Sequence, residues 1–297
     1  MAEGAYAPHE VLVGPGRRAP QLWRLLVGLV VITAVAAALS RLVQMVLLVA
    51  APELAIASPA FAQGNTPASL IVLLGSFGFV TVGVMVAARL LQKRAGLGLI
   101  GPLPLAVRQF WQVMRLLVGL GLLLLVLPPY DMGPELVANL DPVLWTLLLP
   151  VSLLVVLVQV STEEILFRGY IQQALAARFS SPLVWIGVPS VLFAMGHYLP
   201  GEAGDNALLI AAWSGLFGIL TADLTARAGT LGPAIAVHLF NNVTALLIVA
   251  LPDSLSGLAL YTVPFSMDDT GPLRAWLAVD FAMMIVSWLA ARLAIRR

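Results

Sequence analysis

The sequence predicts an all-α membrane protein, a polytopic bundle of about eight transmembrane helices with both termini in the cytoplasm. Composition is the first observation: 60% of the 297 residues are hydrophobic, 10% are charged, and the mean hydropathy is +0.97. Soluble domains carry about 25% charged residues. The second observation is a series of apolar stretches long enough to cross about 30 Å of hydrocarbon. The third is the distribution of basic residues along the chain.

Eight apolar stretches are candidate spans, and Pro or Gly residues mark most of the connections between them. In chain order they lie near 22–50, 68–92, 109–128, 143–178, 182–198, 207–226, 231–251 and 272–294. The fourth stretch is too long for one simple crossing, and the fifth is short. We therefore expect a cytoplasmic tail over residues 1–20 and a single membrane domain over residues 21–297.

Basic residues gather at one set of helix ends, while acidic residues occupy the opposite connections. The basic set comprises Arg17, Arg18, Arg24, Arg89, Lys93, Arg94, Arg108, Arg178, Arg227, Arg292, Arg296 and Arg297. Cytoplasmic ends of membrane helices carry an excess of Lys and Arg, so this side should face the cytoplasm. The expected location is the plasma (inner) membrane of a prokaryote.

The composition argues against nucleic-acid binding and against cysteine chemistry. The net charge is only +1 and the arginines form no single basic face, so the bilayer, and not nucleic acid, is the expected environment. The chain has no cysteine, which rules out disulfides, a thiol nucleophile and thiolate metal sites. Any metal would need His, Asp, Glu or Asn ligands.

A charged cluster, Glu163, Glu164 and Arg168, lies in the fourth apolar stretch. A charged side chain at the centre of a bilayer costs roughly 2.5–3.5 kcal/mol even on the lenient insertion scale, so such groups usually mark functional sites. The alternative is structural: Arg168 neutralises Glu164 at i, i+4 and the cluster only joins two helices.

Simple helix geometry tests which polar groups can meet. The turn after the fourth stretch falls near Ser180, and Glu163 and His197 each lie seventeen residues from it. In an antiparallel hairpin they would therefore stand at the same height. His238 lies only about 13 Å above its own turn near Gly229, whereas Glu163 lies about 25 Å above its turn.

Two arrangements would bring these groups to one level. In the first, the overlong fourth helix protrudes roughly 10 Å further into the cytoplasm, and its polar last turns, with Gln172, Gln173 and Arg178, leave the bilayer. In the second, the helix breaks at Ser161, where Ser-Thr-Glu-Glu is typical of a capping box. Both stay open from sequence, and both place the site in the cytoplasmic half of the membrane.

Three ordered motifs resemble those of a known family. The segments EEILFR at 163–168, FAMGH at 193–197 and HLFNN at 238–242 resemble the EExxxR, FxxxH and HxxxN signatures of the CPBP intramembrane proteases. That family groups CAAX prenyl endopeptidases with bacteriocin-processing and self-immunity (Abi-type) proteins. The resemblance covers about residues 143–250, which would form the catalytic core.

The resemblance implies an intramembrane endopeptidase that splits peptide bonds with an activated water. Glu163 would be the general base on a water also held by His197, and His238 with Asn242 would stabilise the oxyanion. Glu164, which could also act in catalysis, would be supported by Arg168, and Phe193 would pack against an imidazole or line the substrate groove. The substrate would be a protein or peptide, either prenylated or membrane-embedded.

Two versions of this chemistry stay open. Glu163, His197 and His238 match a zinc set of two histidines and one carboxylate with an open position, as in a metalloprotease. However, the helical HExxH pairing of most zincins is missing. The same residues also suffice for a metal-free glutamate mechanism.

Three other functions would also account for polar residues inside the membrane. Ser214 with His238 would form a serine dyad, but their heights above the shared turn differ by roughly 9 Å. A transporter would use Asp223 and Asp280 as further proton stations, although no internal repeat is visible in the sequence. A catalytically silent scaffold would keep the polar cluster as a structural core.

Overall fold

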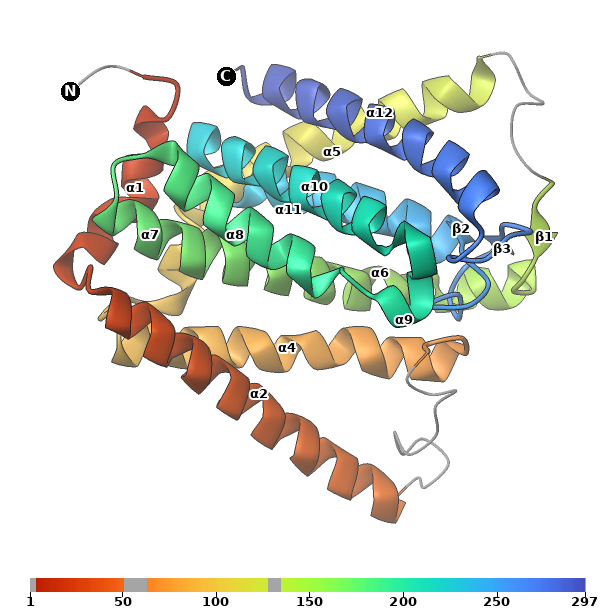
Figure 1. The fold of residues 1–297 in the computed structure, drawn as a ribbon, viewed down its shortest axis with the longest axis horizontal. Helices are drawn as coiled ribbons and strands as arrows, with labels where there is room; N and C mark the ends of the chain where they lie inside the picture. The colour runs from red at the N-terminus through yellow and green to blue at the C-terminus, as the bar shows by residue number, and fades with distance from the viewer. Residues whose placement is uncertain (1–3, 51–62, 128–134, 297) are drawn as a thin grey trace.

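A computed structural model describes residues 4–50, 63–127 and 135–296, and within these ranges the protein is a bundle of helices (Figure 1). Six helical segments are long and apolar enough to cross a membrane. They are α2 (Leu22–Ala50), α4 (Pro67–Leu90), α5 (Leu103–Val126), a composite helix over Pro142–Arg178, a segment over Pro200–Ala228 that contains α9 (Pro200–Ala203) and α10 (Ala207–Ala228), and α12 (Thr270–Ile295).

Two shorter apolar helices complete the bundle. They are α8 (Pro182–Gly196) and the segment Gly232–Ile248, in which α11 (Gly232–Val243) continues into the π-helical turn η7 (Thr244–Ile248). All eight predicted stretches are therefore helical, which confirms the all-α class. Six reach full spanning length, so the count of eight crossings stays a prediction.

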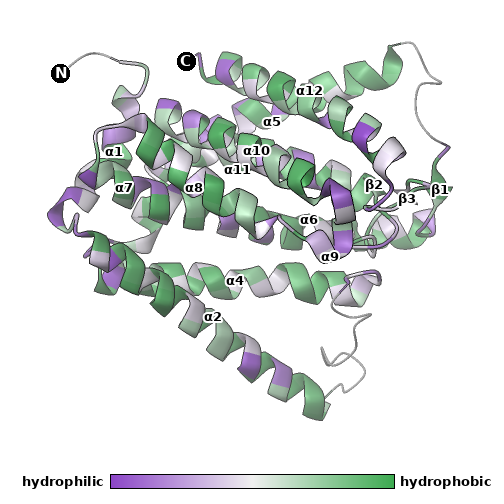
Figure 2. Cartoon of the chain, viewed as in Figure 1, coloured by the Kyte–Doolittle hydropathy of each residue, from purple (hydrophilic) through white to green (hydrophobic). Residues whose placement is uncertain are grey.

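Hydrophobic residues run along most of the helices, and hydrophilic residues gather near the N-terminal turns and around α9 (Figure 2). Several outward-facing apolar side chains are largely exposed, for example Val30 at 68%, Leu125 at 78% and Leu147 at 73%. Such a surface would be unstable in water but suits contact with lipid. Both chain termini lie at one end of the bundle, toward the left of Figure 1.

The long fourth helix is unbroken, and its protrusion from the bilayer stays a prediction. It consists of α6 (Pro142–Glu164), the π-helical segment η5 (Ile165–Ile171) and α7 (Gln172–Arg178). Its 37 residues would span about 55 Å at 1.5 Å per residue, well beyond the hydrocarbon thickness. Ser161 lies inside α6, so the capping-box break does not occur. The following turn comprises residues 179–181, as predicted.

The end of this helix is covered by other segments of the protein. Gln172 and Gln173 are completely buried. Their side-chain amides donate to the carbonyl oxygens of Ala222 (3.1 Å) and Leu99 (2.8 Å). Backbone carbonyls of other segments therefore accept from both side-chain amides, and whether these polar turns leave the bilayer stays a prediction.

Residues 4–18 form part of that cover. They fold into short helical turns, η1 (Ala7–His9), α1 (Glu10–Val13) and η2 (Gly14–Arg18), which contact α7 and α10. Leu12 and Val13 are buried, and Tyr6 Oη donates to Asp223 Oδ1 at 2.8 Å. This N-terminal segment is thus packed on the bundle rather than extending as a free tail.

Close helix packing positions the central helices. Gly232, at the start of α11, lies so near α5 that a Cβ would approach Ala106 O to 2.1 Å, and a Cβ on Gly218 of α10 would meet Ser190 of α8 at 3.0 Å. Small residues at such crossings let membrane helices approach closely. Gly229 ends α10 in the left-handed conformation (φ 68°), so the predicted turn before α11 is also confirmed.

A small sheet lies at the end of the bundle opposite the termini (Figure 1). Its strands, β1 (Val137–Ala138), β2 (Val249–Ala250) and β3 (Tyr261–Thr262), are arranged in the order β1-β3-β2. Val137 pairs with Thr262 in the antiparallel half, and Val249 pairs with Tyr261 in the parallel half. The sheet joins the connections after α5, α11 and β2 on this side.

Candidate active site

The neighbouring glutamates at the end of α6 occupy different environments. The Glu164 side chain is completely buried, whereas that of Glu163 is 14% exposed. Successive residues on a helix point about 100° apart, so the two carboxylates face different neighbours. The two carboxylates are therefore suited to different chemical roles.

Glu164 joins the composite helix to α11. Its Oε1 lies 2.8 Å from His238 Nδ1 on α11, and its Oε2 lies 3.3 Å from Arg168 Nε one turn further along the composite helix. The predicted i, i+4 pair is therefore present, together with a histidine contact that the pair alone did not predict. Glu164 is therefore held by contacts at both of its carboxylate oxygens.

Arg168 is nearly inaccessible, with 1% of its side chain exposed. Its Nη2 donates to Gly218 O on α10 at 3.4 Å, and its guanidinium carbon lies 4.8 Å from the centroid of the Phe193 ring. The ring face offers a cation–π contact to a desolvated guanidinium. Arg168 thereby links η5 to α10 and to Phe193 of α8.

Glu163 has one oxygen held and one without a partner. Its Oε1 accepts a hydrogen bond from Gln159 Nε2 at 2.7 Å. Its Oε2 lies 3.5 Å from His238 Nε2 and makes no hydrogen bond within the described part of the chain. This oxygen and the facing imidazole nitrogen are therefore neighbours without a hydrogen bond between them.

Gln159 is a site residue that the sequence reasoning missed. Besides donating to Glu163, it accepts from Asn242 Nδ2 at its Oε1, at 2.8 Å. Asn242 is therefore connected to Glu163 through this amide. The sequence could have indicated Gln159, because it is a lone polar residue in an apolar run and precedes Glu163 by one helical turn.

His238 has a defined hydrogen-bonding pattern. A carboxylate only accepts, so the Nδ1 beside Glu164 carries the proton, and Nε2 is the nitrogen that faces Glu163. The ring of Phe217 lies edge-on at 4.9 Å and completes the apolar wall around the imidazole. Phe217 was also missed, and its position within an aromatic-poor apolar helix gave no clear signal.

His197 lies at the C-terminal end of α8, where the helix ends. Its Nδ1 is 2.9 Å from Phe193 O, a carbonyl that only accepts, so Nε2 is left available for other contacts. Its ring centroid lies 4.5 Å from that of Phe193, which in turn lies 6.2 Å from that of His238. Phe193 therefore contacts both histidines, as the prediction for this aromatic residue required.

The predicted zinc ligands do not form a ready-made cluster. In residues 4–50, 63–127 and 135–296, no group of three His, Asp or Glu side chains is placed to hold a metal ion. His238 Nδ1 is engaged by Glu164, and one oxygen of Glu163 is engaged by Gln159. The zinc set of Glu163, His197 and His238 stays a prediction without support from the arrangement of its donors.

Ser214 and Asp223, the residues of the serine-dyad and transporter interpretations, have different neighbours. Ser214 Oγ is buried and has no hydrogen-bond partner among the residues described, so a Ser214–His238 dyad is not formed. Asp223 accepts from Tyr6, from Arg227 Nε at 2.8 Å and from Trp288 Nε1 at 3.0 Å. These bonds make Asp223 a structural junction between the N-terminal segment, α10 and α12.

Residues 145–244 match the family described as "Type II CAAX prenyl endopeptidase Rce1-like". The matched segment comprises 100 of the 297 residues. The match confirms the resemblance to CPBP proteases and contains every predicted site residue, together with Gln159 and Phe217. The N-terminal segment, α2, α4, α5 and α12 lie outside the Rce1-like segment and build the rest of the bundle around it.

One relative is similar to part of this chain. The uncharacterized protein YyaK of Bacillus subtilis (strain 168) is 27% identical over 123 residues, which cover 40% of this chain and 39% of YyaK. The chain thus matches about two fifths of that protein's length. No solved structure shows significant similarity to the chain.

Proposed function

We propose that the protein is an intramembrane endopeptidase that hydrolyses peptide bonds near the cytoplasmic side of the membrane. The observation that carries this proposal is the Glu163 carboxylate, which is held through Oε1 while Oε2 is unpartnered and faces His238 Nε2 at 3.5 Å. A fixed carboxylate with one free oxygen is the geometry that a general base requires. The Rce1-like match supports the same chemistry.

Glu163 Oε2 takes a proton from a water molecule, and the water oxygen forms a bond to the scissile carbonyl carbon. The carbonyl electrons move onto oxygen, which becomes the oxyanion of a tetrahedral intermediate. Glu163 then delivers its proton to the leaving nitrogen as the carbon–nitrogen bond breaks. His197, whose Nε2 is left available by the Phe193 bond, helps to hold the attacking water.

His238 and Asn242 stabilise the oxyanion in this scheme. His238 keeps its Nδ1–H on Glu164, and a hydrogen on Nε2 would be donated to the oxyanion. Asn242 uses one amide hydrogen for Gln159, and its second hydrogen remains for the substrate. Glu164 and Arg168 position the imidazole without contacting the substrate.

The proposed substrate is a protein or peptide whose scissile bond reaches the membrane interior. The Rce1-like match supports a prenylated protein as the substrate, and a transmembrane segment is the second candidate. A prenylated CAAX peptide is therefore the first substrate to test, followed by a library of membrane peptides.

The test compares the purified wild type with Glu163→Gln and His197→Ala. Both variants should lose at least about 10²-fold in kcat, because general acid–base catalysis contributes about 10²–10⁴-fold. Glu202→Gln is the matched control, since Glu202 is an exposed glutamate far along the chain from the cluster, and it should cleave at the wild-type rate. Equal cleavage by all four proteins would refute the assignment.

The same assay decides the role of a metal. We expect cleavage to survive exhaustive chelation, with no stoichiometric zinc found by elemental analysis, because no group of three His, Asp or Glu side chains in the described part of the chain is placed to hold a metal ion. Loss of activity on chelation with recovery on adding zinc would instead favour the set of Glu163, His197 and His238. A transporter would show proton-coupled flux in liposomes that is lost in Asp280→Asn.

A further inference from the structure

A basic cavity lies outside the candidate active site, between the N-terminal segment and the turn that follows α4. Its volume is about 490 Å³, and Arg18, Lys93 and Arg94 all line it. Its other lining residues are Gly, Pro and Ala, so no acidic side chain compensates the three cations there. A cavity of this size holds a small ligand, and its charge selects an anion.

Arg94 is the cation that most needs a partner. Only 8% of the residue is exposed, and its Nη2 donates to two neutral oxygens, Gln173 Oε1 at 2.8 Å and Gly98 O at 3.1 Å. Its Nε and Nη1 are buried without a hydrogen bond in the described chain. Burial with no carboxylate nearby lowers the pKa of Arg94 to about 10. A buried, half-satisfied guanidinium is costly unless an anion binds it.

The backbone beside Arg94 is also strained. Lys93 has φ 54°, a left-handed conformation that is unfavourable for a residue with a Cβ. Such strain recurs where the surrounding structure fixes side chains at ligand sites. Here it occurs at the residue that places a second cation on the same cavity as Arg94. By contrast, Arg17 is neutralised by Glu10 at 2.7 Å and does not line the cavity.

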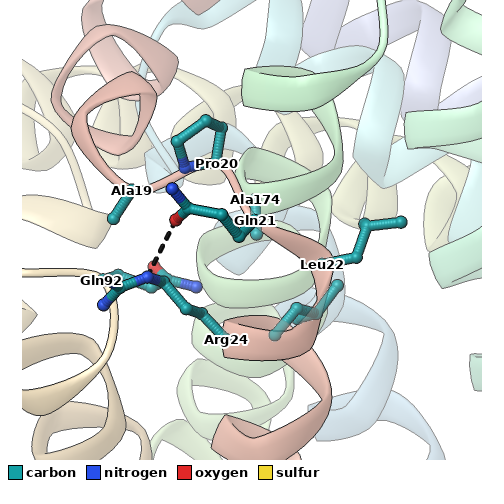
Figure 3. Close-up of a pocket in the computed structure, with 8 residues that line it drawn as sticks. Ala19, Pro20, Gln21, Leu22, Arg24, Gln92 and Ala174 are labelled. Atoms are coloured by element: carbon teal, nitrogen blue, oxygen red, sulfur yellow. Dashed lines mark hydrogen bonds between the residues drawn. The ribbon is translucent and has the colours of Figure 1, made fainter.

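A second cavity close to this turn helps to define what can bind. It is lined by Gln21, Arg24 and Gln92 among others (Figure 3), and its volume is only about 10 Å³. Arg24 is already bonded there to Gln21 Oε1 and to Leu91 O, both at 2.8 Å. That volume holds at most about one water. Only the larger, basic cavity has room for a polyatomic anion.

We propose that the basic cavity binds the phosphate of an anionic lipid headgroup at the cytoplasmic surface of the membrane. The guanidinium of Arg94 would bind phosphate oxygens, with Lys93 and Arg18 neutralising the remaining charge. The surface beside the cavity favours a lipid over a free phosphate. Val11, Leu90 and Leu97, on the segments that form it, are 56%, 64% and 63% exposed and offer apolar contact for acyl chains.

Native mass spectrometry of the purified full-length protein in detergent tests this site, with phosphatidylglycerol and phosphatidylcholine as probes. We expect tighter retention of phosphatidylglycerol. Arg94→Gln should weaken its binding more than tenfold, and Lys93→Gln should weaken it about fivefold, as expected for loss of one cation near a lipid surface. Lys93 is exposed, so its variant keeps the fold and the result stays interpretable if Arg94→Gln misfolds.

Arg108→Gln is the matched control, because Arg108 is an exposed arginine on the same predicted membrane side and does not line the cavity. It should bind phosphatidylglycerol like the wild type. Equal retention of both lipids, or unchanged binding in Lys93→Gln, would overturn the proposal. Tight binding of inorganic phosphate or pyrophosphate that displaces phosphatidylglycerol would overturn the lipid assignment and leave a soluble phosphate ligand.

Discussion

His9 should make attachment of the N-terminal segment to the bundle sensitive to acid. Its side chain is buried, with 4% of the residue exposed, and its ring lies 4.8 Å from the ring of Trp185 on α8. Its Nε2 has no partner among the described residues. Burial lowers the pKa of His9 from 6.5 to about 4; Glu10 opposes this shift slightly, and Arg17 adds to it.

The magnitude follows from these two values. The difference between 6.5 and about 4 corresponds to roughly 3 kcal/mol at about 1.4 kcal/mol per pKa unit. The neutral imidazole is the form that fits the packed segment. Its stabilisation is therefore fully present above pH 6.5 and is lost as the pH falls toward 4. Between pH 7 and pH 5 the equilibrium between packed and detached segment should shift roughly twentyfold.

Thiol labelling measures this shift directly, because the wild-type chain has no cysteine. Leu12→Cys places a thiol at a completely buried position of the segment, and Val11→Cys places one at an exposed neighbour. The ratio of their labelling rates cancels the intrinsic pH dependence of thiol reactivity. We expect this ratio to rise roughly twentyfold from pH 7 to pH 5.

The same pair of cysteines in a His9→Gln background provides the control. Glutamine has no titrating group in this range, so the ratio should stay constant between pH 7 and pH 5. An equal rise in the presence and absence of His9 would show that another group controls the segment. A constant ratio in the protein that retains His9 would show that the burial of this histidine has been overestimated.

Three further substitutions test the site and its packing. Arg168→Gln leaves Glu164 buried without its cation and should cost about 3–5 kcal/mol of thermal or denaturant stability in detergent, whereas the exposed Arg115→Gln should cost little. Gln159→Leu releases Glu163 Oε1 and should lower kcat about 10²-fold without unfolding the protein. Gly232→Ala drives a Cβ toward Ala106 O and should cost about 1–3 kcal/mol, while Gly119→Ala meets no atom within 4 Å and should be neutral or stabilising.

The helices could be predicted because the residues within each helix and at its ends determine it. Hydropathy over about 20 residues indicated all eight segments, and Pro182 and Gly229 marked the turns where the structure has them. The burial of Gln172 and Gln173 was not predictable in this way. Their partners, Ala222 O and Leu99 O, come from distant segments, and backbone carbonyls leave no trace in the sequence.

The sequence indicated which residues belong to the site better than it indicated which of them bond to each other. The motifs indicated Glu164, Arg168 and His238, and these residues do meet. The interpretation grouped His238 with Asn242 because one turn of α11 separates them. In the structure each bonds to a different residue of α6, His238 to Glu164 and Asn242 to Gln159. Helix rotation about its own axis decides such pairing, and residue spacing does not report it.

The roles of the two neighbouring glutamates follow from these partners. The two oxygens of the fully buried Glu164 side chain face Arg168 and His238, so its carboxylate is committed to holding the helices and the imidazole together. Glu163 accepts a hydrogen bond from a neutral amide at one oxygen, and its other oxygen makes no hydrogen bond and lies 3.5 Å from His238 Nε2. Of the two adjacent glutamates, only Glu163 has any exposed side-chain surface, so it is the better candidate to exchange a proton with water. The Glu164–His238 contact fixes the nitrogen that faces Glu163.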